Sequence, residues 1–600
     1  MYLYKLLSVS NSSLRYVRRE NDRTALCQPL SALLQRCLPW TPSRLSSWTA
    51  CATTSGSIHL TAGDPAAFDP LVDLVCRLPA LLDLAWCLPM RVPPALVRIS
   101  PPQGRFRLQV EMFDLRSLHV PIGQQPRDED MDAEDYALLT APRLHRIGCP
   151  DLWEFDIYGN WNYNEEAIAQ ALVSPQARSR VEHILVEYRE PGDALGTRDA
   201  LQASRASWPG LFLLSSSDSR SHGDRSFPAS KRPLKTLSLD NNRGMTLQIL
   251  ERWDEVVDLS ALLHLDLGLV RPELVPTLRN MAGIGALASL QTLKLTLDLF
   301  ENDDPRGTTK DLCSVIKALR PLRSLHLGRT NSRAIFDALL GAHGPHLREL
   351  SLDEPIVLTS QNAHRLAKVC SRLRELNVTI RRSGGDESEV AFYKALGHLS
   401  RLESVSITLD CTRPDSDITG LIKSGEFSTD KYDRETSIRL VQDALVNVAI
   451  DEDLARSIFL AIARTQKRRA DEIGLRQFML RRVVVECPDS NLFDSHSEFS
   501  TLLQWLRGHW VCESSVGLGD PDCIFNPGGQ ARTIVTARDK GAQRKTQYED
   551  WLFAYLDEID PLVEDAWLRL WPCEHGEWKR SWKGRPLASN ASYSSGPCDS

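Results

Sequence analysis

The middle of the chain repeats a hydrophobic pattern of the form Leu-x-x-Leu-x-Leu, in which other aliphatic residues also occupy the apolar positions. The first positions of seven such hexamers are separated by 28, 28, 32, 25, 26 and 29 residues. One hexamer arises easily by chance in a leucine-rich chain, whereas seven at a near-constant period do not. The hexamers are LKTLSL (234–239), LLHLDL (262–267), LQTLKL (290–295), LRSLHL (322–327), LRELSL (347–352), LRELNV (373–378) and LESVSI (402–407).

Each hexamer predicts a short β-strand, because apolar residues two apart point to the same face of a strand. The segments between hexamers, such as LQILERWDEVV (247–257), place apolar residues three and four apart and predict helices with one buried face. A single strand–helix unit cannot bury its own apolar side, but stacked units share one core. We therefore predict an α/β leucine-rich-repeat solenoid, with parallel strands on a concave face and helices on a convex face.

A doubly wound α/β sheet also alternates strands with helices, and it stays open as an alternative, although it gives no reason for a fixed period. Weaker matches extend the pattern on both sides and predict degenerate repeats from about residue 70 to about residue 480. These matches are LLDLAW (81–86), LWEFDI (152–157), VEHILV (181–186) and LRQFML (475–480).

The chain is predicted to have five segments. The last hundred residues hold Trp505, Trp510, Trp551, Trp567, Trp571, Trp578 and Trp582, half of the 14 tryptophans, and buried tryptophans there favour a cap on the end of the repeats. The segments are a partly disordered N-terminal segment (1–67), degenerate repeats with a mobile loop at 190–231 (68–233), clear repeats (234–409), degenerate repeats or helices (410–485), and a Trp-rich, mainly helical C-terminal cap with a disordered tail (486–600).

Composition limits the function classes. Hydrophobic residues make up 42% and charged residues 25%, which excludes a wholly disordered, collagen-like or membrane-bundle protein. The net charge of -7 has the wrong sign for a chain-wide nucleic-acid footprint. No stretch approaches the roughly 18 apolar residues of a membrane span, so no membrane partner is expected. The 14 cysteines lack the density of a disulfide scaffold, so reduced thiols and a cytoplasmic or nuclear location are expected.

Recognisable catalytic chemistry is absent from the sequence. It has no phosphate-cradling G-x-x-x-x-G-K-[ST] loop, no H-E-x-x-H, no G-x-S-x-G and no C-x-x-C. Cys573 and His575, taken with Cys512 and Cys523, match no compact zinc spacing. His343 and His346 stand in a predicted helix-ending turn, where capping or exposure explains them. We therefore expect no enzyme activity, no catalytic residue, no cofactor and no metal.

The predicted concave face carries the polar residues that alternate with the buried leucines. This face has mixed charge and few aromatic residues, which disfavours a nucleic-acid groove and is compatible with protein binding. The candidate protein-binding residues are Ser238, Asp240, His264, Asp266, Lys294, His326, Glu349, Ser351, Glu375, Asn377 and Ser406.

Four segments carry a family resemblance: LPALLDLAWCLPMRVPPALVRISP (78–101), FRLQVEMFDLRSL (106–118), DYALLTAPRLHRI (135–147) and HGEWKRSWKGRPL (575–587). In these segments the chain resembles filamentous-fungal proteins in which an F-box precedes leucine-rich repeats. The resemblance implies an adaptor that holds a target on its repeats and binds a cullin ubiquitin ligase through the Skp adaptor. Residues 1–60 lack the Leu-Pro-x-Glu type of opening and the three short helices of an F-box, so the F-box is expected either to be lost or to lie upstream of Met1.

Two classes of function therefore remain. The favoured one is a non-catalytic interaction protein that binds an unidentified protein partner on its repeats, in its specific form a ubiquitin-ligase substrate receptor. The alternative is an enzyme regulator, or an enzyme whose active residues are not recognisable in the sequence. A deep polar pocket with strongly shifted pKa values would favour the alternative.

Overall fold

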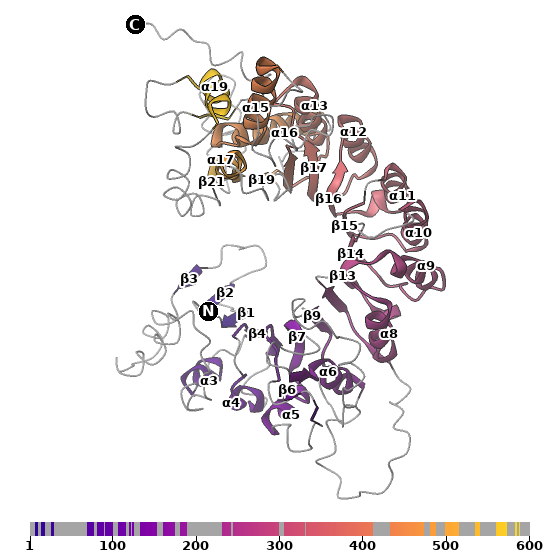
Figure 1. Ribbon diagram of the computed structural model, residues 1–600. Helices are drawn as coiled ribbons and strands as arrows, with labels where there is room; N and C mark the ends of the chain where they lie inside the picture. Colours follow the sequence, from indigo (N-terminus) through magenta and orange to yellow (C-terminus); the bar gives the residue numbers. More distant parts are fainter. Residues whose placement is uncertain are drawn as a thin grey trace, which may run out of the picture. The chain divides into compact units, whose positions relative to one another are not determined.

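The structure is a computed structural model of the 600-residue chain and comprises two compact units, Met1–Asn302 and Asp303–Ser600 (Figure 1). The residues that it describes are 6–9, 14–17, 26–28, 69–76, 81–88, 91–99, 106–115, 119–121, 123–124, 133–152, 160–173, 180–188, 231–241, 244–298, 305–330, 332–411, 433–472, 474, 480–487, 498–514, 535–539, 560–572, 582–584 and 587.

A mostly parallel sheet forms the first unit. At one end of the sheet, β3, β2 and β1 pair antiparallel. Strand β1 then pairs in parallel with β4, and the strands from β4 to β14 pair in parallel and in chain order. In hydrogen-bonded order the strands are β3 (Leu26–Gln28), β2 (Leu14–Val17), β1 (Leu6–Val9), β4 (Asp83–Trp86), β5 (Arg107–Val110), β7 (Leu144–Leu152), β9 (His183–Tyr188), β11 (Thr236–Asn241), β13 (His264–Val270) and β14 (Thr292–Leu297).

Helices connect successive parallel strands of this unit. Helix α8 shows why: Ile249, Leu250, Trp253 and Val256 are buried on one face, and the Thr246 hydroxyl accepts a hydrogen bond from the Ile249 amide at 3.4 Å, which caps the helix. The helices are α3 (Asp69–Cys76), α4 (Pro94–Arg98), α5 (Ala133–Leu139), α6 (Asn164–Val173), α8 (Leu247–Val256) and α9 (Val275–Gly283), with 3-10 turns η4 (Leu259–Ala261) and η5 (Pro272–Leu274).

Two small sheets accompany the large one in the first unit. Strand β6 (His119–Pro121) pairs antiparallel with β8 (Asn160–Asn162). Strand β10 (Arg232–Pro233) pairs parallel with β12 (Val257–Asp258).

The second unit continues the alternation of strands and helices. Strands β15 to β19 pair in parallel and in chain order, and β20 and β21 add to β19 in antiparallel fashion. Helices α10 to α13 lie along one side of strands β15 to β18 (Figure 1). The elements are β15 (Ser324–Gly328), β16 (Glu349–Val357), β17 (Glu375–Arg381), β18 (Ser404–Asp410), β19 (Arg482–Glu486), β20 (His509–Ser514), β21 (Val535–Asp539), α10 (Pro305–Ala318), α11 (Arg333–His343), η6 (Gly344–His346), α12 (Ser360–Val369) and α13 (Glu387–Leu396).

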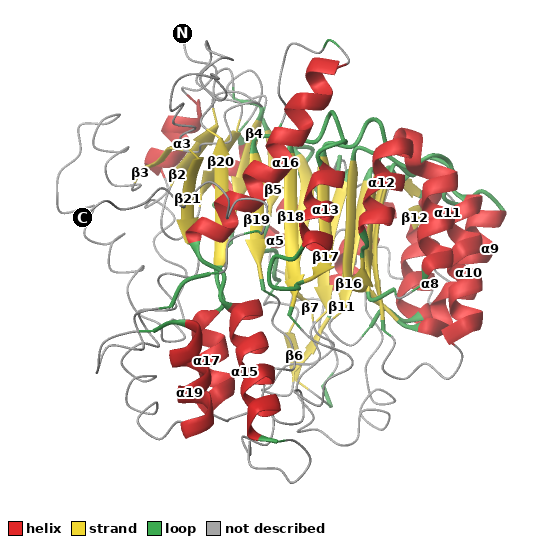
Figure 2. Cartoon of the chain, turned by 90° about the horizontal axis from the view of Figure 1, so that it is seen from above, coloured by secondary structure: helices red, strands yellow, loops and turns green. Residues whose placement is uncertain are grey.

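The described part of the second unit has four further helices: α15 (Arg434–Val448), α16 (Glu452–Glu472), α17 (Glu498–Leu506) and α19 (Pro561–Leu570). Helix α16 packs against α13 and against strands β19 to β21, and α15 packs beside α17 and α19 (Figure 2). Trp567 and Trp571 meet edge to face with ring centroids 4.6 Å apart. Trp505 meets Trp582 in the same way at 6.0 Å.

The predicted α/β class is confirmed at the level of a large, mostly parallel sheet with connecting helices. All seven hexamers lead into strands, β11 and β13 to β18, and the aliphatic residues at the three pattern positions of each hexamer are at most 2% exposed. The weaker match at 152–157 lies mostly outside the described residues, and β7 is the described strand that ends where this match begins. Leu144, Ile147 and Cys149 fill the apolar positions of that strand, because RLHRIGC satisfies the same pattern eight residues earlier.

Several predictions fall outside the described residues: most of the 190–231 loop, Trp551, Trp578 and the C-terminal tail. Within the described part of the chain, no helix combines the length and the apolar character that a membrane crossing requires.

Candidate functional site

The polar positions of the strands share one face of each unit. In the second unit, the parallel register aligns His326 with Ser351, Ser351 with Asn377, and Asn377 with Ser406. The aliphatic residues on either side of these residues are buried, whereas the four polar side chains are partly exposed. We call the polar positions of strands β15 to β18 and of the residues directly before them the strand face of the second unit.

A hydrogen-bonded network crosses this strand face. His326 Nε2 lies 2.6 Å from Asp353 Oδ2, and Ser351 Oγ donates to Asp353 Oδ1 at 3.0 Å. Asn377 Nδ2 donates to Ser351 Oγ at 3.0 Å and to Asp353 Oδ1 at 3.2 Å. Asp353 was not among the predicted site residues, although it lies two positions beyond Ser351 and the period of two would have included it.

The order of these contacts does not suit nucleophilic catalysis. In the Ser-His-Asp arrangement the serine hydroxyl donates to a histidine, and a carboxylate lies behind the histidine. In this network the carboxylate of Asp353 lies between Ser351 and His326. The Ser351 hydroxyl therefore donates its hydrogen bond to a carboxylate, which is a weak base, and not to the imidazole. The network fixes side-chain positions on the strand face and does not activate the serine.

Two charged rows run beside this network. Glu349 and Glu375 are exposed and directly opposite one another in the register. The residues that precede them, Arg348 and Arg374, are exposed as well, as is Arg323 at the equivalent position of β15. This arginine row was not predicted, because its residues directly precede the strands, yet the signal is visible as Leu-Arg at the start of LRSLHL, LRELSL and LRELNV.

The strand face of the first unit has the remaining predicted residues. Ser238 is opposite Asp266, and Asp266 is opposite Lys294, whose Nζ lies 3.0 Å from Asp266 Oδ2. His264 and Asp240 are exposed. Because the candidate residues divide between the two units, the structure brings them together as two sets: Ser238, Asp240, His264, Asp266 and Lys294 in the first unit, and His326, Glu349, Ser351, Glu375, Asn377 and Ser406 in the second.

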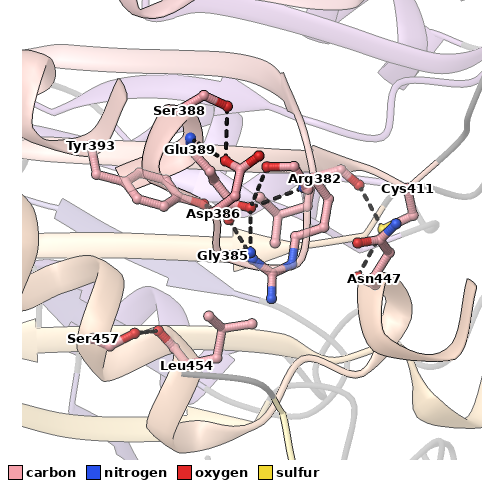
Figure 3. Close-up of polar contacts among 12 residues, drawn as sticks. Arg382, Gly385, Asp386, Ser388, Glu389, Tyr393, Cys411, Asn447, Leu454 and Ser457 are labelled. Carbon is pink, nitrogen blue, oxygen red and sulfur yellow. Dashed lines mark hydrogen bonds and ion pairs between the residues drawn. The ribbon is translucent and has the colours of Figure 1, made fainter. Parts of the chain in front are cut away.

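A buried ion pair lies between β17 and α13 (Figure 3). Arg382 Nη1 donates to Glu389 Oε1 at 2.5 Å, and both side chains are completely buried. The Glu389 carboxylate also accepts from the Tyr393 hydroxyl at 2.7 Å and from the Gly385 amide at 2.9 Å. Burial, and the nearby Glu389 carboxylate, raise the pKa of Tyr393 well above its ordinary value. Because no substrate can reach a completely buried pair, we assign it to the fold.

His343, which sequence reasoning took as a capping or exposed residue, is completely buried, whereas His346 is exposed. The Leu322 amide donates to His343 Nδ1 at 3.2 Å, which joins the end of α11 to the residues before β15. Burial lowers the pKa of His343, so the imidazole stays neutral and can accept this bond.

The comparisons with known proteins assign no family to the chain. No protein-family model matches the chain, and a search of curated proteins finds none similar to it. The resemblance to F-box proteins with leucine-rich repeats therefore stays a prediction.

Proposed function

We propose that the chain is a non-catalytic protein-binding protein, in which leucine-rich repeats of the solenoid type present the strand face of the second unit to a protein partner. The order of the strands supports the repeat architecture. In a doubly wound sheet the strand order reverses at a switch point. The described pairings follow chain order from β4 to β14 in one unit and from β15 to β19 in the other, as stacked repeats require.

The observation that carries the proposal is the arginine row beside the glutamate row. Three successive repeats present exposed arginines, Arg323, Arg348 and Arg374, and two of them add exposed glutamates. Arg374 is also paired with Glu403 at 3.5 Å. A partner with complementary charges would bind this exposed row, and arginine is among the residues that dominate protein interfaces.

The more specific form of this proposal is a substrate receptor of a cullin ubiquitin ligase. It rests on the sequence resemblance alone. In this form the strand face would hold the target, while another part of the chain would bind the Skp adaptor.

Affinity capture from native cell extract, with quantitative mass spectrometry, tests the proposal. We expect the variant Arg323→Ala/Arg348→Ala to capture at least about tenfold less of the specific partner than the wild type does. The reason is that truncating an interface arginine often costs more than about 1 kcal/mol of binding free energy. The matched control is Arg333→Ala/Arg439→Ala, which removes two exposed arginines from helices α11 and α15 of the same unit.

Equal capture by the wild type and by the strand-face variant would contradict the assignment of the partner to this face. Recovery of the Skp adaptor and a cullin by the wild type and by both variants would support the ligase form. Recovery of a strand-face partner without them would leave a binding protein of another kind.

A further inference from the structure

Two histidines and a glutamate converge at the beginning of strands β7 and β9 in the first unit. The parallel pairing of these strands aligns Arg146 with His183, and therefore brings His145 beside Glu182. One ligand atom from each of His145, Glu182 and His183 lies within 4.8 Å of the other two. The two imidazole rings meet edge to face with centroids 4.9 Å apart. His145 precedes Glu182 by 37 positions and His183 by 38, so only the strand pairing reveals the cluster.

Both imidazoles are available as neutral ligands. Burial and the neighbouring His145 lower the pKa of His183 to about 4, and burial and Arg107 lower the pKa of His145. Neither ring therefore has to lose a proton before it can bind a metal ion near pH 7. The Thr236 hydroxyl lies 2.9 Å from His183 Nδ1, which fixes the ring and leaves Nε2 for a ligand. Such an outer hydrogen bond accompanies most metal-binding histidines.

A cation already lies beside the cluster. The Lys235 ammonium forms an ion pair with Glu182, and the lysine side chain is 54% exposed, so it can move into solvent. On the other side, Arg107 Nη1 is 3.5 Å from His145 Nε2, at the outer limit of a hydrogen bond. Two other nitrogens of Arg107 are held by Asp83 at 2.7 and 2.8 Å. Arg146, which also faces the cluster, is paired with Glu111 at 3.1 Å.

We infer that His145, Glu182 and His183 form a binding site for a divalent transition-metal ion of the Zn²⁺ class. Two imidazole nitrogens and one carboxylate oxygen are a ligand set that suits Zn²⁺ and leaves a fourth position for water. Mg²⁺ and Ca²⁺ prefer oxygen ligands, so the two histidines disfavour them. When the ion binds, Lys235 leaves Glu182. This inference is independent of the proposed protein binding, because the cluster lies in the other unit.

Cobalt(II) titration of the full chain, followed by visible absorption, tests the site. Co²⁺ replaces Zn²⁺ in such sites and reports its ligands, because thiolate ligands add a strong near-ultraviolet charge-transfer band. We expect one Co²⁺ per chain, with visible bands and without the thiolate band. Zn²⁺ should displace it. The thiolate band separates this site from any Co²⁺ that is bound by the 14 cysteines.

Substitutions of the ligands and of Lys235 are expected to change the Co²⁺ affinity in opposite directions. His183→Gln and Glu182→Gln should each weaken Co²⁺ binding about tenfold or more, and Thr236→Val about tenfold, because it releases the His183 ring. Lys235→Met should tighten binding roughly tenfold, because it removes the competing ammonium. The matched control Lys294→Met removes another lysine from the strand face of the same unit and should leave the affinity unchanged.

The circular dichroism and the thermal midpoint of each variant show whether it folds. Equal Co²⁺ affinity in the wild type and in a folded His183→Gln variant would overturn the site. A loss of binding in Lys235→Met would overturn it as well, because only competition between the ammonium and the metal ion predicts a gain.

Discussion

At the scale of single residues, His343 shows how a buried polar side chain joins the end of a helix to the residues before the preceding strand. Its Nδ1 accepts the Leu322 amide, so His343→Ala leaves a buried donor without its partner. We expect this substitution to lower the free energy of unfolding by about 2–3 kcal/mol at pH 8. His346→Ala, an exposed position three residues later, should change it by less than about 0.5 kcal/mol.

The same residue predicts a pH dependence. Because burial lowers the pKa of His343 in the folded protein, the unfolded chain takes up a proton first as the pH falls below about 6.5. The stability that this histidine contributes is thus complete above about pH 6.5 and declines below it. The difference in unfolding free energy between the wild type and His343→Ala should therefore be smaller at pH 5.5 than at pH 8. Urea unfolding at both pH values measures this difference. A difference that widens at pH 5.5 would contradict this account.

At the scale of elements, the connection from β17 to α13 depends on the buried ion pair. Removing one partner of such a pair leaves an uncompensated charge, and Arg382 Nε and Nη2 already have no hydrogen-bond partner among the described residues. We expect Glu389→Gln to cost about 3–5 kcal/mol of unfolding free energy. Arg382→Met/Glu389→Leu should cost less, since no charge is left buried. Denaturant unfolding of both variants measures the difference.

Glu387→Gln is the control for this comparison, because Glu387 is exposed in the first turn of the same helix. Glu387→Gln should lower the free energy of unfolding by less than about 1 kcal/mol. If Glu389→Gln were as mild as Glu387→Gln, the ion pair would not stabilise this connection.

The elements could be predicted from the sequence wherever the hydrophobic period was regular. Leu237 and Leu239 are buried as the period of two requires, and so are the equivalent residues of the six later strands. Strand β7 was not predicted, although Leu144, Ile147 and Cys149 satisfy the same pattern eight residues before the match at 152–157. Arg382 and Glu389 could not be predicted as a pair, since the pattern carries no information about which polar residues a turn will bury.

At the scale of the whole molecule, the α/β class followed from the sequence, whereas the arrangement of polar residues did not. The metal-site cluster combines His145 with Glu182 and His183, and only the pairing of β7 with β9 makes them neighbours. The arginine row in turn depends on which residues before each strand remain exposed. Both features require knowledge of neighbouring strands, which a single sequence does not contain.

The central claim is that a protein partner binds the strand face of the second unit. Carboxyl-group labelling of the free chain and of its captured complex, read by mass spectrometry, tests it most directly. The account predicts that Glu349 and Glu375 lose labelling in the complex, whereas the exposed helix residues Glu387 and Asp471 keep theirs. Protection of Glu387 and Asp471, with full labelling of Glu349 and Glu375, would contradict it.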